Sequence, residues 1–145
     1  MIKIICVGKI KEKYLNEFID DYKTRINAYH KLEIIELKDS NIETESKEIL
    51  NKISDKDFNI ILDIKGKKYD SIEFSKLIEN TFSKSYGTIT FIIGASNGVT
   101  DEVKNKCDLR LSFSDMTFPH GVFRGMLLEQ IYRSFKILNN ESYHK

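Results

Sequence analysis

The chain has 145 residues, of which 41% are hydrophobic and 31% are charged, and its formal net charge is +1. This length suits a single domain, residues 1–145, that buries its own core, and the balanced charge excludes a polycation that binds nucleic acid over its whole surface. The apolar runs are too short to cross a bilayer, and the first of them lacks the basic head and cleavage site of a signal peptide. We therefore expect a cytoplasmic protein that binds neither membranes nor DNA.

Apolar residues in the first part of the chain alternate between the period of a strand and that of a helix. β-branched runs predict buried strands, and apolar residues at helical spacing with charges between them predict amphipathic helices. Glu45 lies on the polar face of the second predicted helix. The expected elements are strand Ile2–Val7, helix Lys11–Asn27, strand Leu32–Leu37 and helix Ile42–Ile53.

The rest of the chain repeats this alternation and contains two helix-start signals. Asp70 with Glu73 three residues later predicts a capping box. Thr100 predicts an N-cap, because two acidic residues follow it where the helix dipole favours them. The expected elements are strand Phe58–Leu62, helix Asp70–Phe82, strand Thr88–Ile93, helix Thr100–Cys107, strand Leu109–Phe113 and helix Gly121–Leu138.

This order of elements predicts an α/β fold with a largely parallel sheet flanked by helices. In such sheets, ligands bind beyond the carboxyl ends of the strands. The turns that follow Val7, Leu62, Ile93 and Phe113 are therefore expected to line one crevice.

Two segments at this edge are candidates to hold a small molecule. Leu111–His120 contains the only proline, Pro119, together with hydroxyl and large apolar side chains that suit a pocket wall. The loop Gly94–Gly98 lacks the lysine of a P-loop and the glycine pair of a dinucleotide site, so it is either a plain tight turn or a place where backbone approaches a ligand. His120 opens the last helix, where it either packs at the turn or takes part in chemistry.

Metal and thiol chemistry find little support in the sequence. The three histidines and two cysteines have no metal-ligand spacing, so we expect no metal site. Cys6 and Cys107 are expected to be reduced thiols. Basic residues form three clusters, each of which is more simply a solvated face than a binding site. These clusters are Lys9, Lys11 and Lys13; Lys65, Lys67 and Lys68; and Arg124, Arg133, Lys136 and Lys145.

The last predicted helix carries apolar residues over more than one face. A helix that is apolar on two faces needs two surfaces to cover it. One surface is the sheet of the same chain, and we expect the other to belong to a second copy in a symmetric dimer.

Five groups of motifs extend over nearly the whole chain. They are Val7-Gly8-Lys9 with Lys11–Tyr14, Gly94–Gly98, Leu111–Ser114 with Met116–His120, Glu129–Arg133 and Tyr143–Lys145. Taken together they resemble the ribosomal RNA large subunit methyltransferase H family, because their combined order is specific although each motif alone would be weak.

The resemblance implies a SPOUT-type homodimer whose C-terminal part forms a deep trefoil knot. It further implies S-adenosylmethionine as cofactor and methylation of N3 of a pseudouridine in the subunit-interface stem-loop of 23S rRNA, on the assembled 70S ribosome. By similarity, the cofactor contacts are Leu62, Gly94, Phe113, Ser114, Asp115, Met116, Thr117 and Phe118.

The implied reaction requires N3 of the base to lose its proton. The candidates for assisting this loss are His144 or Tyr143 from the tail of a second copy, or His120, with Arg133 or Lys145 stabilising the developing anion. Two other functions stay open at this point: an RNA-binding or ribosome-binding α/β module that has lost its chemistry, and a SPOUT methyltransferase that acts on transfer RNA.

Overall fold

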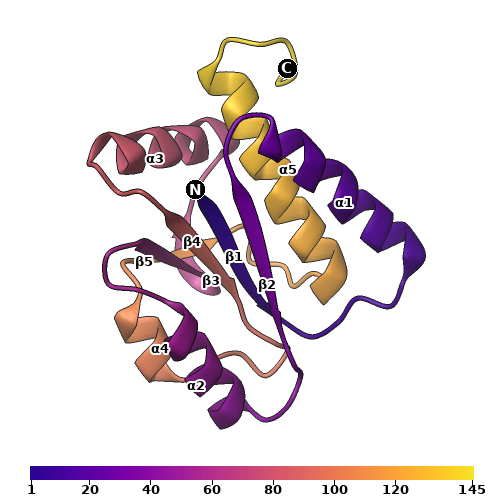
Figure 1. Cartoon of the computed structure of the whole chain (residues 1–145), viewed down its shortest axis with the longest axis vertical. Helices are drawn as coiled ribbons and strands as arrows, with labels where there is room; N and C mark the ends of the chain where they lie inside the picture. The colour runs from indigo at the N-terminus through magenta and orange to yellow at the C-terminus, as the bar shows by residue number, and fades with distance from the viewer.

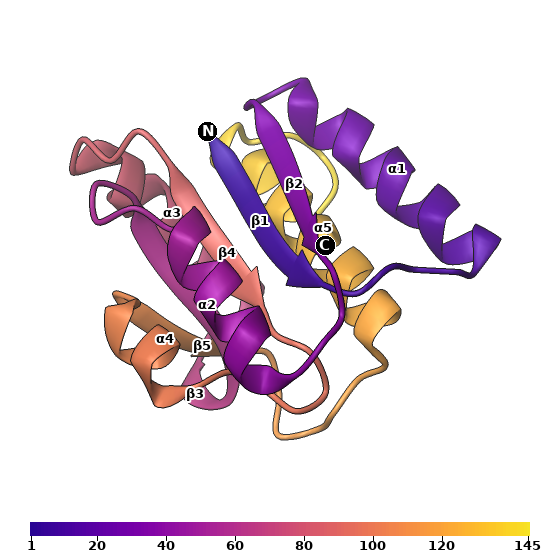
Figure 2. The same ribbon diagram turned by 60° about the horizontal axis from the view of Figure 1, so that its bottom comes forward.

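A five-stranded parallel sheet forms the middle layer of the protein, which we describe from a computed structural model of residues 1–145. Helices α1, α3 and α5 pack on one face of the sheet, and α2 and α4 pack on the other (Figures 1 and 2). The strand order is β2-β1-β4-β3-β5. The elements are β1 Ile2–Val7, α1 Lys13–Asn27, β2 Leu32–Leu37, α2 Ile42–Lys52, β3 Phe58–Lys68, α3 Ser71–Ser83, β4 Ile89–Ile93, α4 Asp101–Lys106, β5 Leu109–Ser112 and α5 His120–Leu138.

The predicted α/β fold with a parallel sheet is confirmed, and so are the bounds of β1 and β2. The capping box at the start of α3 is also present: the Asp70 side chain accepts from the Glu73 N–H at 2.7 Å, and the Glu73 side chain accepts from the Asp70 N–H at 3.0 Å. These features depend on short-range sequence signals. They form here because the tertiary structure agrees with the local preference.

The predicted N-cap at Thr100 is confirmed for α4, although its hydroxyl makes no capping bond and its backbone N–H donates to Ser46 Oγ on α2. The prediction that Glu45 lies on an exposed polar face was wrong. Glu45 is buried and accepts from the backbone N–H of Ser40 at 2.6 Å. Burial raises the pKa of the Glu45 carboxyl. The Glu45 side chain therefore points back to the turn before α2 and bonds to it, instead of facing solvent.

Strand β3 is longer than predicted and irregular. Its pairing with β5 shifts between Leu62 and Lys67, so Leu111 of β5 is opposite both residues. Gly66 makes this close approach possible, since a Cβ there would lie 2.6 Å from the backbone of Arg110. The segment after Leu62 is mainly polar, so its side chains carry no strand periodicity from which this extension could be predicted.

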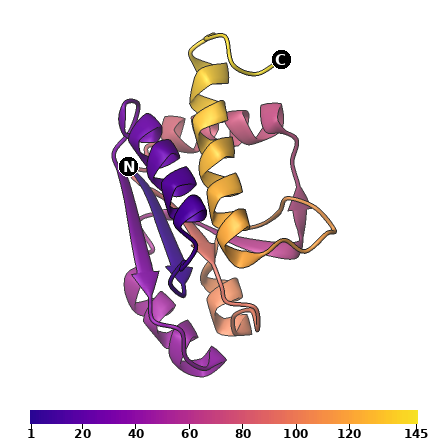
Figure 3. The same cartoon turned by 90° about the vertical axis from the view of Figure 1, so that its right-hand side faces the viewer.

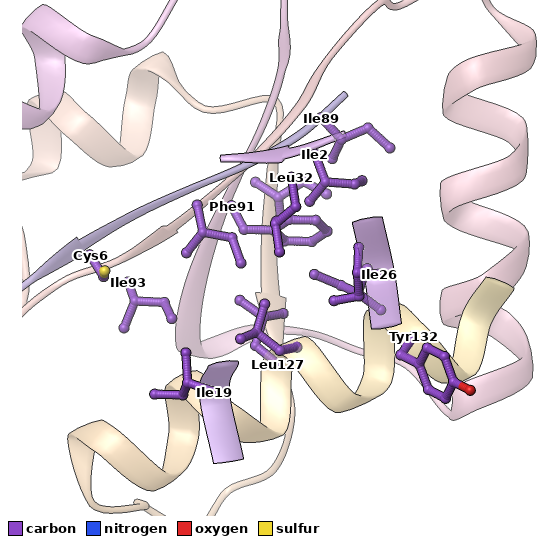
Figure 4. Packing of buried hydrophobic residues seen from close by; sticks show 14 of the residues in the cluster. Ile2, Cys6, Ile19, Ile26, Leu32, Ile89, Phe91, Ile93, Leu127 and Tyr132 are labelled. Carbon is purple, nitrogen blue, oxygen red and sulfur yellow. The ribbon is translucent and has the colours of Figure 1, made fainter. Parts of the chain in front are cut away.

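Helix α5 lies between α1 and α3, and all three pack on the sheet (Figure 3). In Figure 4, Phe91 of β4 and Leu127 of α5 lie within the same apolar cluster, and both are fully buried. The second apolar face of α5 is thus partly covered by α1 and α3 of the same chain. No helix in the protein combines the length and apolar character needed to cross a membrane.

Both cysteines are free, as the sequence predicts. Cys6 is buried in β1, with its Sγ 3.6 Å from the carbonyl oxygen of Ile35. Burial raises the pKa of Cys6 and of Cys107 to about 11. Both side chains therefore remain protonated thiols at neutral pH.

Candidate functional site

A cavity of about 520 Å³ lies at the carboxyl ends of β4 and β5, beside residues Ile61–Lys65 in the middle of β3. It is enclosed by these residues, by the loops that follow β4 and β5 and by the start of α5, at the edge that comes forward in Figure 2. Its volume falls within the range of small-molecule sites. Among its lining residues are seven of the eight predicted cofactor contacts: Leu62, Gly94, Phe113, Ser114, Met116, Thr117 and Phe118.

The loop from Phe113 to Pro119 is held in place by its own side chains. Ser112 Oγ donates to the carbonyl of Ser114 at 3.0 Å, and Ser114 Oγ accepts from the N–H of Met116 at 3.1 Å. The rings of Phe113 and Phe118 both pack against Phe123 of α5, with centroids at 5.0 and 6.1 Å. The serine hydroxyls therefore shape the loop, which leaves apolar rings and backbone groups to form the cavity wall.

Asp115, the eighth predicted cofactor contact, lies outside the cavity lining. Its carboxylate forms an ion pair with Lys68 Nζ at 2.5 Å, and its side chain is 79% exposed. The pair joins the loop before α5 to the end of β3. Exposed pairs of this kind contribute little stability, so its main consequence is that two opposite charges cancel beside the cavity.

The glycine loop after β4 is a tight turn that also forms part of the cavity wall. The Gly98 N–H donates to the carbonyl of Ala95 at 2.8 Å, and Gly98 has a φ of +79°. A Cβ at Gly94 would lie 2.8 Å from Val99 Cγ1 and 3.3 Å from the backbone of Gly98. The glycine at position 94 is therefore required by the packing of the turn itself, and this packing shapes the cavity.

His120 lines the cavity from the first turn of α5 and contacts a buried arginine. Arg124 Nη2 donates to His120 Nε2 at 2.9 Å and to the carbonyl of Gly8 at 2.9 Å, while Nη1 donates to Glu36 Oε2 at 2.8 Å. Arg124 is only 2% exposed, so it does not belong to the basic surface cluster in which the sequence placed it. It ties the ends of β1 and β2 to the start of α5.

This contact determines the tautomer of His120. Arginine can only donate, so Nε2 must accept and the ring proton of the neutral form resides on Nδ1. Burial and the positive charge of Arg124 lower the pKa of His120. His120 is therefore neutral at pH 7, and its accepting nitrogen is already occupied.

The other three catalytic candidates lie near the far end of α5. Arg133 donates to Glu129 through Nε at 2.9 Å and contacts His144 Nδ1 through Nη1 at 3.1 Å. The Tyr143 hydroxyl lies 3.1 Å from Glu129 Oε1 and 3.1 Å from the Tyr22 hydroxyl. The C-terminal tail thus docks on α5 and α1 of its own chain.

Within one chain, the structure does not bring all four catalytic candidates together. Arg133 is thirteen residues beyond His120 on the same helix, which corresponds to a rise of roughly 20 Å. Figure 3 shows the tail at the opposite end of α5 from the loop that encloses the cavity. Burial raises the pKa of Tyr143, so in this position its phenol is a weak acid that keeps its proton.

Sequence reasoning missed an ion pair in the cavity wall. Asp63 directly follows the buried part of β3, and its carboxylate lies 3.5 Å from Lys104 Nζ of α4. Both side chains are largely buried, at 10% and 27% exposed. The position of Asp63 directly after the predicted strand Phe58–Leu62 was the available signal, whereas Lys104 is an ordinary helix residue in sequence.

Comparison with known proteins assigns the chain to a protein family. A family model described as a predicted SPOUT methyltransferase matches residues 1–144. The chain belongs to the SPOUT methyltransferase family.

Relatives of this SPOUT methyltransferase match it over nearly their full length. "Ribosomal RNA large subunit methyltransferase H 1" of Clostridium perfringens strain SM101 is 48% identical, and the protein named ribosomal RNA large subunit methyltransferase H from Fusobacterium nucleatum is 49% identical. Each alignment covers 99% of both chains. The family resemblance on which the sequence analysis relied is confirmed.

Solved structures agree in fold at low sequence identity. A probable methylase family protein from Haemophilus influenzae superposes with a TM-score of 0.61 at 12% identity, covering 99% of this chain and 70% of that one. The SpoU methyltransferase AviRb from Streptomyces viridochromogenes gives a TM-score of 0.52 at 10% identity, covering 98% and 62%. At these identities the likeness concerns the fold alone.

The cavity of this SPOUT methyltransferase has the chemistry that an adenosine-containing cofactor needs. Leu62, Phe113 and Phe118 provide apolar surface, and the backbone of the two loops provides donors and acceptors. The wall also holds the carboxylate of Asp63 and the ammonium of Lys104, which lie 3.5 Å apart and would have to exchange this pair for contacts with a zwitterionic group. The residues present therefore fit S-adenosylmethionine.

Proposed function

We propose that this protein transfers the methyl group of S-adenosylmethionine to N3 of a pseudouridine in the interface stem-loop of 23S rRNA, on the assembled 70S ribosome. The observation that carries the proposal is the cavity, because residues from β3 and from the loops after β4 and β5, which the family resemblance names as cofactor contacts, line it together. The cofactor supplies an electrophilic methyl on a sulfonium. The chain's own contribution is chiefly to hold the reacting nitrogen in line with that methyl.

We infer that the proton of N3 leaves with help from the tail of a second copy. His120 is poorly suited to accept it, because Arg124 already donates to its Nε2. His144 and Tyr143 remain candidates, with Arg133 and Lys145 stabilising the anion that forms on the base. The tail must then leave its position on its own chain.

A homodimer gives the tail a route to the cavity of the other copy. A second cavity, also about 520 Å³, follows the outer face of α5 between α1 and α3 and is lined mainly by apolar residues, among them Phe18, Phe118 and Met126. A two-fold axis near the middle of α5 would place the tail end of one helix beside the His120 end of the other. The proposed dimer therefore brings the C-terminal tail of one copy to the cavity of the other copy.

Methyl transfer from labelled S-adenosylmethionine tests the proposal. The acceptors are 70S ribosomes and free rRNA, each with and without pseudouridine at the target, and transfer RNA. We expect transfer only to 70S ribosomes that contain pseudouridine. Transfer to transfer RNA instead would show another substrate, and cofactor binding that is undetectable would identify a module without chemistry.

A further inference from the structure

The connection from β1 to α1 and the first turn of α1 form an exposed surface beside the cavity. We propose that this surface binds a single-stranded RNA segment next to the target nucleotide, an inference that rests on the proposed function. We call it the basic platform, and it consists of Lys9, Lys11, Lys13 and Tyr14.

The platform is held rigidly although its side chains are exposed. Ile10 is 5% exposed, so it anchors the segment, while Lys9 and Lys11 on either side face solvent. Asn16 Nδ2 donates to the carbonyl of Ile10 at 2.9 Å, which fixes the backbone before α1 begins. A ligand that binds here meets a surface that is already ordered, so little entropy is lost on binding.

The platform is continuous with the mouth of the cavity. A Cβ at Gly121 would lie 3.5 Å from Ile10 Cδ1, so the segment packs directly on the first turn of α5. A Cβ at Gly8 would lie 3.9 Å from Nε2 of His120, which lines the cavity. Figure 2 shows the β1–α1 connection passing the start of α5. A strand lying on the platform can therefore place its next nucleotide at the cavity.

The platform lysines keep their charge available for a ligand. Lys9 and Lys11 take part in none of the seven ion pairs in the protein, and Lys13 has only a loose pair with Glu17 at 3.9 Å. Glu12 is the single acidic residue between Lys9 and Tyr14. In the rival basic cluster at the end of β3, Lys68 is neutralised by Asp115 and Lys67 lies over the ring of Tyr69 at 5.0 Å, so only Lys65 has no such partner. The clustered free charge suits phosphates.

Tyr14 adds a feature that phosphate binding alone does not need. Its side chain is 67% exposed, and it is the one aromatic residue among the four large hydrophobic residues that the surface exposes. An exposed ring beside lysines is the usual arrangement for stacking an unpaired base while the backbone is held by charge. This combination favours single-stranded RNA over a protein partner.

The experiment compares Tyr14→Ala, Tyr14→Phe and the double variant Lys9→Ala/Lys11→Ala with wild type. The matched control is Lys76→Ala/Lys84→Ala, which removes two exposed lysines from α3 and its C-cap. The readouts are kcat and KM for methyl transfer to 70S ribosomes, cofactor affinity by calorimetry, and co-sedimentation with ribosomes at several salt concentrations.

We expect Tyr14→Ala to raise KM for ribosomes roughly 5- to 100-fold with kcat and cofactor affinity unchanged, and Tyr14→Phe to behave as wild type. The double lysine variant should lower the salt dependence of binding, by about 0.7 in log–log slope for each phosphate that is no longer neutralised. The α3 control should match wild type. Unchanged KM and salt slope in the platform variants, or crosslinks from the platform to a ribosomal protein instead of RNA, would overturn the inference.

Co-sedimentation separates this inference from the proposed function. If wild type binds ribosomes through Tyr14 but transfers no methyl group, the platform is supported and the proposed reaction fails. If wild type methylates the ribosome and the Tyr14→Ala variant binds equally well, the reaction is supported and the platform fails.

Discussion

Replacing Arg124 with methionine tests the buried network that joins β1, β2 and α5. Methionine fills similar space but removes the donors to Gly8, Glu36 and His120. Glu36 is 41% exposed and can be solvated, so its ion pair accounts for less than about 1 kcal/mol. The Gly8 carbonyl and His120 lose charged donors in a half-buried setting, at about 1 to 2 kcal/mol each. We expect a loss of about 3 kcal/mol in the free energy of unfolding.

Urea denaturation and thermal melting measure this loss, which corresponds to roughly 6 to 12 °C in Tm for a domain of this size. Glu36→Gln is the matched control and should cost less than about 1 kcal/mol. NMR titration of the three histidines adds an independent readout: the pKa of His120 should rise in Arg124→Met, because the positive charge that lowers it is gone. A stability change below about 1 kcal/mol, together with an unchanged His120 titration, would refute this account of the network.

Two further predictions concern cofactor binding in the cavity and the pH dependence of the protein's thermal stability. Gly94→Val should abolish cofactor binding in calorimetry, because its side chain displaces Val99 and the backbone of Gly98; retained affinity would contradict the placement of the site. Burial lowers the pKa of His30 and His120, so both favour the neutral form in the folded state. Their contribution to stability is complete above the unfolded value of about 6.5 and is lost as the pH falls through the lowered folded values. Tm should therefore fall between pH 7.5 and 5.5, and His120→Gln should reduce that fall; an equal fall would contradict the assignment.

The fold was largely predictable because its signals are local. The runs Ile2–Val7 and Leu32–Leu37 are strands with the expected bounds, since side-chain period and β-branching both act over a few residues. The second half of β3 was not predictable. Its pairing depends on the absence of a side chain at Gly66 against the backbone of Arg110, which is a contact between distant parts of the chain.

The edge of the sheet that carries the candidate site was predictable from topology, because parallel strands place their carboxyl ends at one edge. Seven of the eight residues that the family resemblance names as cofactor contacts line one cavity at this edge. Arg124 could not be recognised in this way. In sequence it is one basic residue among several, and only the packing of α5 against β1 and β2 reveals that its guanidinium is buried and bonded.

Helix α5 separates the C-terminal tail from the cavity of the same chain, so deleting the tail tests whether two copies share one active site. Deleting Tyr143–Lys145 should abolish methyl transfer and leave cofactor binding intact, because the cavity lies at the other end of the helix. Unchanged turnover would rule out a role for the tail.

Mixing the tail-deleted variant with Gly94→Val then distinguishes action within one chain from action across a dimer. Each variant is inactive alone, but a mixed dimer joins an intact cavity to the intact tail of the other copy. Random exchange of subunits yields mixed dimers in about half of the population, each with one working site, so about a quarter of wild-type activity should return. If the tail acts on its own chain, mixing restores nothing, and the docked position of Tyr143 against Glu129 and Tyr22 must then be the starting point of a movement within one subunit.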